Sequence, residues 1–264
     1  MLYWNLFKNA FMSNFAYKAD TVARGIKALL KLIMQISVWT AIYSVGTNET
    51  LNNNTDLQEM ICYVIVSTGI SILVGKSNIL MIDNKIRTGN IAMDIIKPLS
   101  FRKYTFSVAI GENIYNLVFQ FVPMLIIASL LIRIKIPQFS TIIYFGMFLT
   151  GAILIRFLSG YLLGLLGFWY VTIWHLDRVL SDLISLFAGS FLPLWLFPEW
   201  LKDIADWLPF KFIYYIPISV FLGKINVEEF NFLLLQMVGW IAVLYFGGTL
   251  IWKLGYKSLV VQGG

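Results

Sequence analysis

Long apolar runs separated by short polar stretches dominate the chain, and their lengths predict helices that cross a membrane. A run of about twenty residues matches the roughly 30 Å hydrocarbon core of a bilayer at 1.5 Å per helical residue. Six crossings are expected, of which prolines interrupt the fifth. They span residues 26–45, 58–76, 108–132, 140–171, 183–198 and 231–252. The pattern therefore predicts an all-α polytopic membrane protein with a single transmembrane domain, residues 1–264.

The first 25 residues follow a different pattern, which is typical of a helix that lies on a membrane. Trp4, Phe7, Phe11 and Phe15 recur three or four residues apart, with polar side chains and Lys8 between them. A helix with aromatic residues on one side and Lys on the other binds the membrane interface. We therefore expect an amphipathic interface helix over residues 1–25, with an ordinary packed N-terminal helix as the alternative.

The run 140–171 is longer than one crossing requires, because about 32 residues make roughly 48 Å of helix. It forms either one long tilted helix or two pieces broken near Arg156. An additional crossing would place the basic C-terminal segment outside, so the single helix is favoured. The run also contains glycines that offer small faces for the close packing of another helix. These glycines are Gly151, Gly160, Gly164 and Gly167.

Between residues 198 and 226 the chain is amphipathic and interrupted by prolines. Short apolar segments of this kind form re-entrant or interfacial structure. We expect a re-entrant element in the outer leaflet before the last crossing, with a belt of Trp and Tyr. The residues expected to form an outer gate are Pro193, Pro198, Tyr214, Tyr215 and Pro217.

The distribution of positive charge indicates which loops remain in the cytoplasm. Residues 76–107 carry six of the 20 Lys and Arg side chains, whereas residues 46–59 carry none. Loops rich in Lys and Arg are retained in the cytoplasm, which places residues 76–107 and both termini there. Within this loop the spacing of Ile residues, Gly89 and a terminating Pro98 predict a short helix. We interpret this helix as a coupling element that receives force from a partner.

The composition excludes several classes of function. Apolar residues make up 59% and charged residues 13% of the chain, against roughly 45–50% and about 25% in soluble domains. The net charge of +6 follows the loops and forms no single basic face, so no nucleic-acid partner is expected. One cysteine, Cys62, and one histidine, His175, are too few for a disulfide, a zinc cluster or a conventional catalytic triad. We expect no metal site and no catalytic residue.

One segment is similar to a nucleotide-binding motif but departs from it in spacing and in position. Gly69, Gly75, Lys76 and Ser77 resemble a phosphate-binding loop, but five residues separate the glycines where the motif needs four. The segment also ends an apolar crossing, whereas the motif lies between a strand and a helix. The chain is therefore not expected to hydrolyse nucleotide or to be an enzyme by itself.

Two charged residues fall at membrane depth and are candidates for a translocation path. A charge inside a membrane costs several kcal/mol unless it is paired or hydrated. Arg156 is either a lining residue of a polar path or part of a structural ion pair or helix break. Glu112 is either a coupling carboxylate or a residue at headgroup level that pairs with a nearby Arg or Lys.

The order of these features resembles the permease subunits of ABC-2 type export transporters. Small permeases of that family carry the pattern G-x-I-x-x-D-L-x-[RK]-P after the second crossing. The chain matches it at Gly89, Ile91, Asp94, Lys97 and Pro98, with Ile95 where Leu is usual. The C-terminal signature of the family is matched at Tyr214, Tyr215, Pro217, Gly223, Gln236, Trp240, Trp252, Gly255, Gln262, Gly263 and Gly264. The resemblance covers nearly the whole chain.

The resemblance implies the subunit of an exporter in the bacterial cytoplasmic membrane. Its partners would be two ABC ATPase subunits, which bind ATP and Mg²⁺, a second permease that is identical or a sister subunit, and membrane lipid. This chain itself would hold no cofactor. An aromatic, apolar interior suits an amphipathic substrate such as a drug, an antimicrobial peptide or a lipid. The residues assigned to the ATPase contact are Arg87, Gly89, Asp94, Lys97 and Pro98, with Arg87 and Asp94 pairing across that interface.

Two other functions remain open at this point. An ion-coupled carrier or channel would use Glu112 or Arg156 for gradient-driven flux. A membrane enzyme acting on lipid or peptide would need a cluster of reactive residues at one depth, and the sequence offers none.

Overall fold

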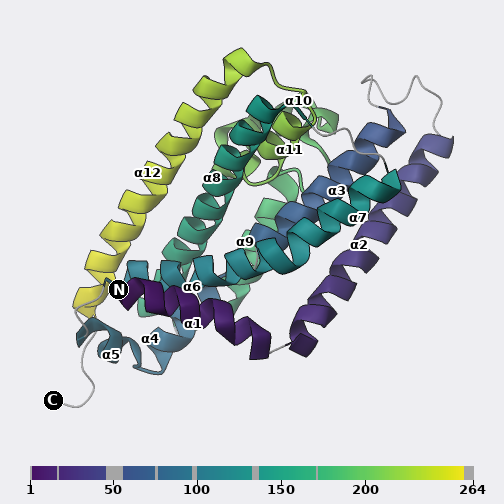
Figure 1. The fold of residues 1–264 in the computed structure, drawn as a ribbon. Coiled ribbons are helices and arrows are strands. Elements are labelled where there is room, and N and C mark those ends of the chain that lie inside the picture. Colours follow the sequence, from purple (N-terminus) through teal and green to yellow (C-terminus); the bar gives the residue numbers. More distant parts are fainter. Residues whose placement is uncertain are drawn as a thin grey trace.

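The computed structural model describes residues 2–16, 18–45, 56–74, 77–96, 100–132, 137–170 and 172–258. Within these ranges the chain forms helices and turns, and no strand. Figure 1 shows the helices gathered into a bundle, with α4 and α5 at one end and α10 and α11 at the other. Two predicted ATPase contacts, Lys97 and Pro98, lie outside the described residues, as does the Gln262–Gly264 signature.

Helices of very different length alternate along the chain. The first half contains α1 (Leu2–Ala16), α2 (Lys18–Val45), α3 (Leu57–Val74), α4 (Ile79–Arg87), α5 (Ile91–Ile96), α6 (Phe101–Asn116), the π-helical turn η1 (Leu117–Phe121) and α7 (Val122–Ile132). The second half contains α8 (Phe139–Gly164), η2 (Leu165–Phe168), α9 (Trp174–Phe187), η3 (Leu194–Leu196), α10 (Glu199–Trp207), η4 (Pro209–Phe212), α11 (Tyr215–Phe221) and α12 (Val227–Ser258).

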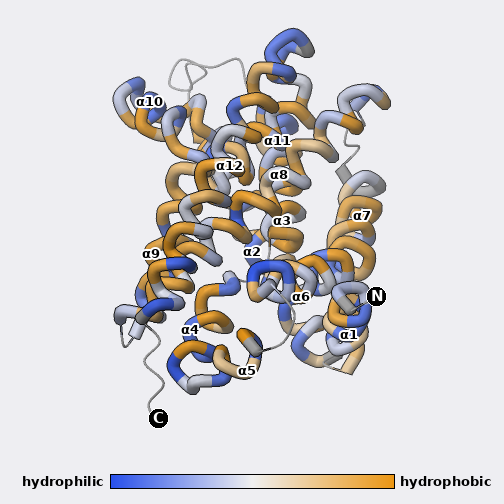
Figure 2. Tube along the Cα trace, turned by 90° about the vertical axis from the view of Figure 1, so that its left-hand side faces the viewer, coloured by the Kyte–Doolittle hydropathy of each residue, from blue (hydrophilic) through white to orange (hydrophobic). Residues whose placement is uncertain are grey.

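Five segments of the described chain are long and apolar enough to cross a membrane. They are centred on α2, α3, the α6–α7 segment, α8 and α12. Figure 2 shows apolar residues along these segments and polar residues concentrated toward both ends of the bundle. α8 passes through Arg156 without a break and continues into η2, so the prediction of a single helix over this run is confirmed.

The expected fifth crossing is assembled from short pieces. α9 has 14 residues, or about 21 Å of helix, which is less than the roughly 30 Å of the hydrocarbon core. It begins at Trp174, before the predicted crossing at 183–198, because one face of this segment buries Leu180 and Ile184. Shortly after α9, Gly189 adopts a φ of 76°, a left-handed conformation that glycine tolerates best. η3, α10, η4 and α11 then complete the path toward α12.

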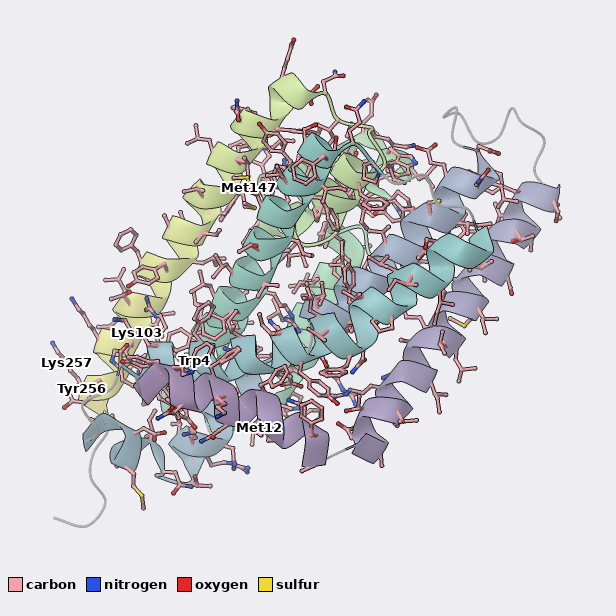
Figure 3. All side chains as sticks on the ribbon, viewed as in Figure 1. Trp4, Met12, Lys103, Met147, Tyr256 and Lys257 are labelled. Carbon is pink, nitrogen blue, oxygen red and sulfur yellow. The ribbon has the colours of Figure 1, made fainter. Side chains whose placement is uncertain are left out.

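The N-terminal helix is shorter than predicted. α1 ends at Ala16 and α2 starts at Lys18, so residues up to 25 belong partly to the first crossing. α1 lies against α6 (Figure 1), and a Cβ added at Gly111 of α6 would lie 2.6 Å from the carbonyl oxygen of Phe7. The helix is therefore packed on the bundle, while Trp4 and Met12 point outward from it (Figure 3).

Candidate functional site

α4 and α5 form a helical hairpin at one end of the bundle (Figure 1). The sequence predicted one helix here, and this prediction is wrong because the chain turns between Arg87 and Ile91. Gly89, at the turn, has a φ of 72°, which a side chain would strain. A Cβ at this glycine would meet no atom within 4 Å, so the backbone conformation alone requires Gly. Gly89 therefore permits this turn, while its contact with an ATPase stays a prediction.

An ion pair joins the two helices of the hairpin. Lys85 of α4 donates a hydrogen bond to the carboxylate of Asp94 in α5, and its Nζ lies 4.2 Å from the centre of the Tyr104 ring. The Asp94 side chain is only 9% exposed. Arg87 and Asp94 were expected to pair across an interface with the ATPase, and this contact stays a prediction; in the structure the Asp94 carboxylate accepts from Lys85. Asp94 therefore braces the hairpin.

The hairpin rests directly on the glycine face of α8. Ile82 of α4 and Ile91 of α5 are fully buried. A Cβ added at Gly164 would lie 3.0 Å from Ile82, and one at Gly160 would collide with the Asn78 side chain. The glycines thus allow the two backbones to approach closely, as small residues do between membrane helices.

The predicted use of the α8 glycines is confirmed, and Gly151 serves α12 in the same way by facing Met237.

The exposed surface of the hairpin is its tip. Arg87, Gly89 and Asn90 are exposed there, and Met93 is exposed over 65% of its surface. Sequence reasoning missed Met93, although its position two residues after buried Ile91 places it on another side of α5. The tip therefore presents one cation and one large apolar side chain to a partner.

The structure brings Arg156 and Glu112 to the same cavity. This cavity has a volume of about 170 Å³ and is also lined by Asn78 and Asn113. Arg156 is 8% exposed, and its Nη2 lies 3.4 Å from Oγ of Ser181 in α9. Its Nη1 has no hydrogen-bond partner among the described residues. The arrangement can hold water or an anionic group inside the bundle.

Glu112 is paired with Arg24 of α2, at a distance of 3.1 Å between Oε1 and Nη1. This geometry matches the interpretation of Glu112 as a residue that pairs with a nearby Arg or Lys. The two residues are 88 positions apart in the sequence, so no local spacing could have identified the partner.

The predicted gate residues gather at the opposite end of the bundle from the hairpin. Pro193 precedes η3 and Pro198 precedes α10, while Tyr214, Tyr215 and Pro217 surround the start of α11. The segment after α9 is fixed to α3, because Tyr63 donates to the carbonyl oxygen of Gly189 and Ser67 donates to that of Ser190 at 2.6 Å. These residues therefore lie at the same end of the bundle. Their role as a gate stays a prediction.

A bundle of membrane-spanning helices with a short helical hairpin at one end defines a multi-pass membrane protein. The model of the family described as ABC-2 family transporter protein matches residues 29–263. The match covers most of the chain, so the chain belongs to this family and the predicted resemblance is confirmed. A comparison with curated proteins finds no match. Membership in the family makes the chain a membrane transport subunit, for which ABC ATPase subunits are the general partners.

Proposed function

We propose that the chain is the permease subunit of an ATP-driven exporter. Two separate ABC ATPase subunits, which bind ATP and Mg²⁺, would act on the α4–α5 hairpin, and a second permease would complete the transport path. The observation that carries this proposal is the contact between the hairpin and the α8 glycines. A partner that displaces the hairpin displaces a membrane-spanning helix with it, because tightly packed groups transmit strain.

Outward transport is part of this proposal and is combined with a proposed orientation in the membrane. The α4–α5 end and both termini face the cytoplasm, as the concentration of Lys and Arg in residues 76–107 favours. Tilting of α8 would then move an amphipathic drug, peptide or lipid outward. The α10–α11 end, with Tyr214 and Tyr215, would open toward the outer leaflet of the bacterial cytoplasmic membrane.

The test of this function addresses the hairpin tip. We would replace Arg87→Ala and Met93→Ser, singly and together, and purify the protein with its ATPase partner in mild detergent. The double variant is expected to retain about one tenth or less of the substrate-stimulated ATP hydrolysis, because removing an exposed interface anchor commonly costs about 1–2 kcal/mol or more.

Matched controls come from α1, at the same end of the molecule. Lys8→Ala and Met12→Ser remove an exposed cation and an exposed Met outside the hairpin, and Figure 3 shows Met12 on the outer side of α1. These variants should keep full coupling. Unchanged coupling in the Arg87/Met93 double variant would refute the proposed docking role.

The second candidate function is an ion-coupled carrier or channel. The cavity shared by Arg156 and Glu112 favours it, whereas the ion pair of Glu112 with Arg24 disfavours a freely titrating carboxylate. Flux into vesicles without ATPase decides between the two functions. A carrier would show gradient-driven flux that Glu112→Gln abolishes, and an ATP-driven permease would show none.

A further inference from the structure

A larger cavity lies between α6, α8 and α12, beside α5. Its volume is about 650 Å³, within the roughly 300–1,000 Å³ of typical ligand sites. α12 packs on α8, and α6 packs on α8 as well, which leaves the cavity between α6 and α12. Side-chain contacts that bridge this gap include the stacking of Phe101 on Trp252 at 5.1 Å and a hydrogen bond from Arg102 to Thr249.

The lining of this cavity changes from polar to apolar along the helices. α6 begins and α12 ends at the α4–α5 end of the bundle (Figure 1), and the residues nearest that end include Arg102, Lys103 and Thr249. Residues farther along the same helices are apolar, among them Phe106 and Ile241, together with Leu154 of α8. The cavity therefore has a charged mouth and a hydrocarbon interior, which matches an amphiphile that lies parallel to the helices.

Arg102 gives the mouth an uncompensated positive charge. Its guanidinium lies between two aromatic rings, 5.1 Å from the centre of Tyr161 and 4.2 Å from that of Tyr245. Nη2 donates to Oγ1 of Thr249 at 2.8 Å, while Nε is buried without a hydrogen-bond partner among the described residues. No ion pair joins Arg102 or its neighbour Lys103 to a carboxylate of the described chain.

The nearest acid does not neutralise these cations. Asp94 also lines the cavity, but its carboxylate is paired with Lys85. An aromatic rim of Trp252 and Tyr256 adjoins the charged residues, as is typical at the level of lipid headgroups. Figure 3 shows Lys103, Tyr256 and Lys257 at the same end of the molecule.

We propose that this cavity binds an anionic phospholipid. The phosphate would be held by Arg102 and Lys103, because guanidinium and ammonium groups form charge-assisted hydrogen bonds to phosphate oxygens. One acyl chain would lie along Phe106, Leu154 and Ile241. The ammonium group of a zwitterionic lipid would lie near two cations, and the described lining residues offer it no unpaired carboxylate. The site therefore favours lipids with a net negative charge.

With the proposed orientation of the permease, this lipid belongs to the cytoplasmic leaflet; the binding itself does not depend on that orientation. We would measure binding by native mass spectrometry of the full-length protein in mild detergent, with phosphatidylglycerol or phosphatidylethanolamine of equal chain length. At least about tenfold tighter binding of phosphatidylglycerol is expected, which corresponds to about 1.4 kcal/mol. Equal binding of the two lipids by the wild-type protein would overturn the proposal without any variant.

Two variants locate the site. Arg102→Gln with Lys103→Gln should reduce phosphatidylglycerol binding about tenfold or more, whereas Lys257→Gln removes a cation from the same end but outside the cavity lining and should have no effect. Leu154→Trp fills the apolar interior and should lower lipid binding while it keeps both cations. An equal loss in the Lys257 variant would show general attraction to the surface and refute a specific site.

A competition experiment distinguishes a lipid from a free phosphate compound. Glycerol 3-phosphate in millimolar excess should leave phosphatidylglycerol bound, because it lacks the acyl chains that occupy the interior. Displacement of the lipid by glycerol 3-phosphate would identify a soluble phosphate ligand and overturn the lipid assignment. Because none of these measurements involves ATP hydrolysis, their failure is separable from a failure of the proposed transport function.

Discussion

The two ends of the bundle are built from similar parts and are attached to it differently. Both consist of short helices near glycines with positive φ, namely Gly89 at one end and Gly189 and Gly223 at the other. The α4–α5 hairpin is braced by the Lys85–Asp94 ion pair and sits on the backbone of α8. The α10–α11 end is held by an aromatic core that includes Phe212 and Trp195, and by hydrogen bonds to α3.

Under the proposed function, this difference in packing sets how each end would respond to force. The hairpin is a compact unit with a main seat on one crossing helix, so a push on it enters α8. The α10–α11 end is shared between α3, α8 and its own short helices. A displacement there is distributed, which suits a part that rearranges in pieces.

The largest effect is expected where the hairpin meets α8. Gly164→Leu adds four carbons against fully buried Ile82, and overpacking of this kind costs about 1–3 kcal/mol or more. The midpoint of thermal unfolding in detergent should fall by several degrees, and coupling to the ATPase should be lost with it. The control is Gly146→Leu on the same helix, where a Cβ meets no atom within 4 Å. Equal losses in both variants would show that the contact between the hairpin and Gly164 has no special role.

A smaller effect is expected from the brace inside the hairpin. Lys85→Met or Asp94→Leu leaves one charge without its partner, which costs about 2 kcal/mol for a largely buried pair. The double variant Lys85→Met/Asp94→Leu should lose less than the sum of the single variants, because no isolated charge remains. Thermal unfolding of the four proteins measures this coupling. Strict additivity would mean that the two side chains do not stabilise each other.

The smallest effect is expected from an ion pair at the opposite end. Lys224 lies 3.1 Å from Glu59 of α3, and the two side chains are 26% and 28% exposed. Solvent screens such a pair, so Glu59→Gln should cost less than about 1 kcal/mol. The same unfolding assay tests this value. A loss as large as that from the Lys85–Asp94 brace would remove the contrast between the two ends.

The sequence was sufficient for features that depend on local composition. Hydropathy and the distribution of Lys and Arg identified the long crossings and residues 76–107. Helical spacing also identified the glycine face of α8. Helix ends were less accurate, as shown by α1, which ends at Ala16, and by α9, which begins at Trp174 where the crossing was predicted from residue 183.

Features that depend on the meeting of distant segments could not be predicted. In the sequence, Arg102 is one of the cations of residues 76–107, and nothing beside it indicates a binding role. Its hydrogen-bond partner Thr249 lies 147 positions away. The pairing of Asp94 with Lys85 depends on the reversal of the chain at Gly89, within a segment that was predicted to be one helix. Arg156 remained ambiguous for the same reason, since Ser181 belongs to a helix that the sequence did not predict at that position.

The uninterrupted course of α8 gives the molecule a lever. Its 26 residues make a rod of about 39 Å, with the hairpin seated near one end. A rotation of about 5° about the midpoint of this rod would carry each end through roughly 1.7 Å, which is less than a third of the 5.4 Å helical pitch. In the proposed transport cycle, a tilt of this size would leave the glycine contacts in register.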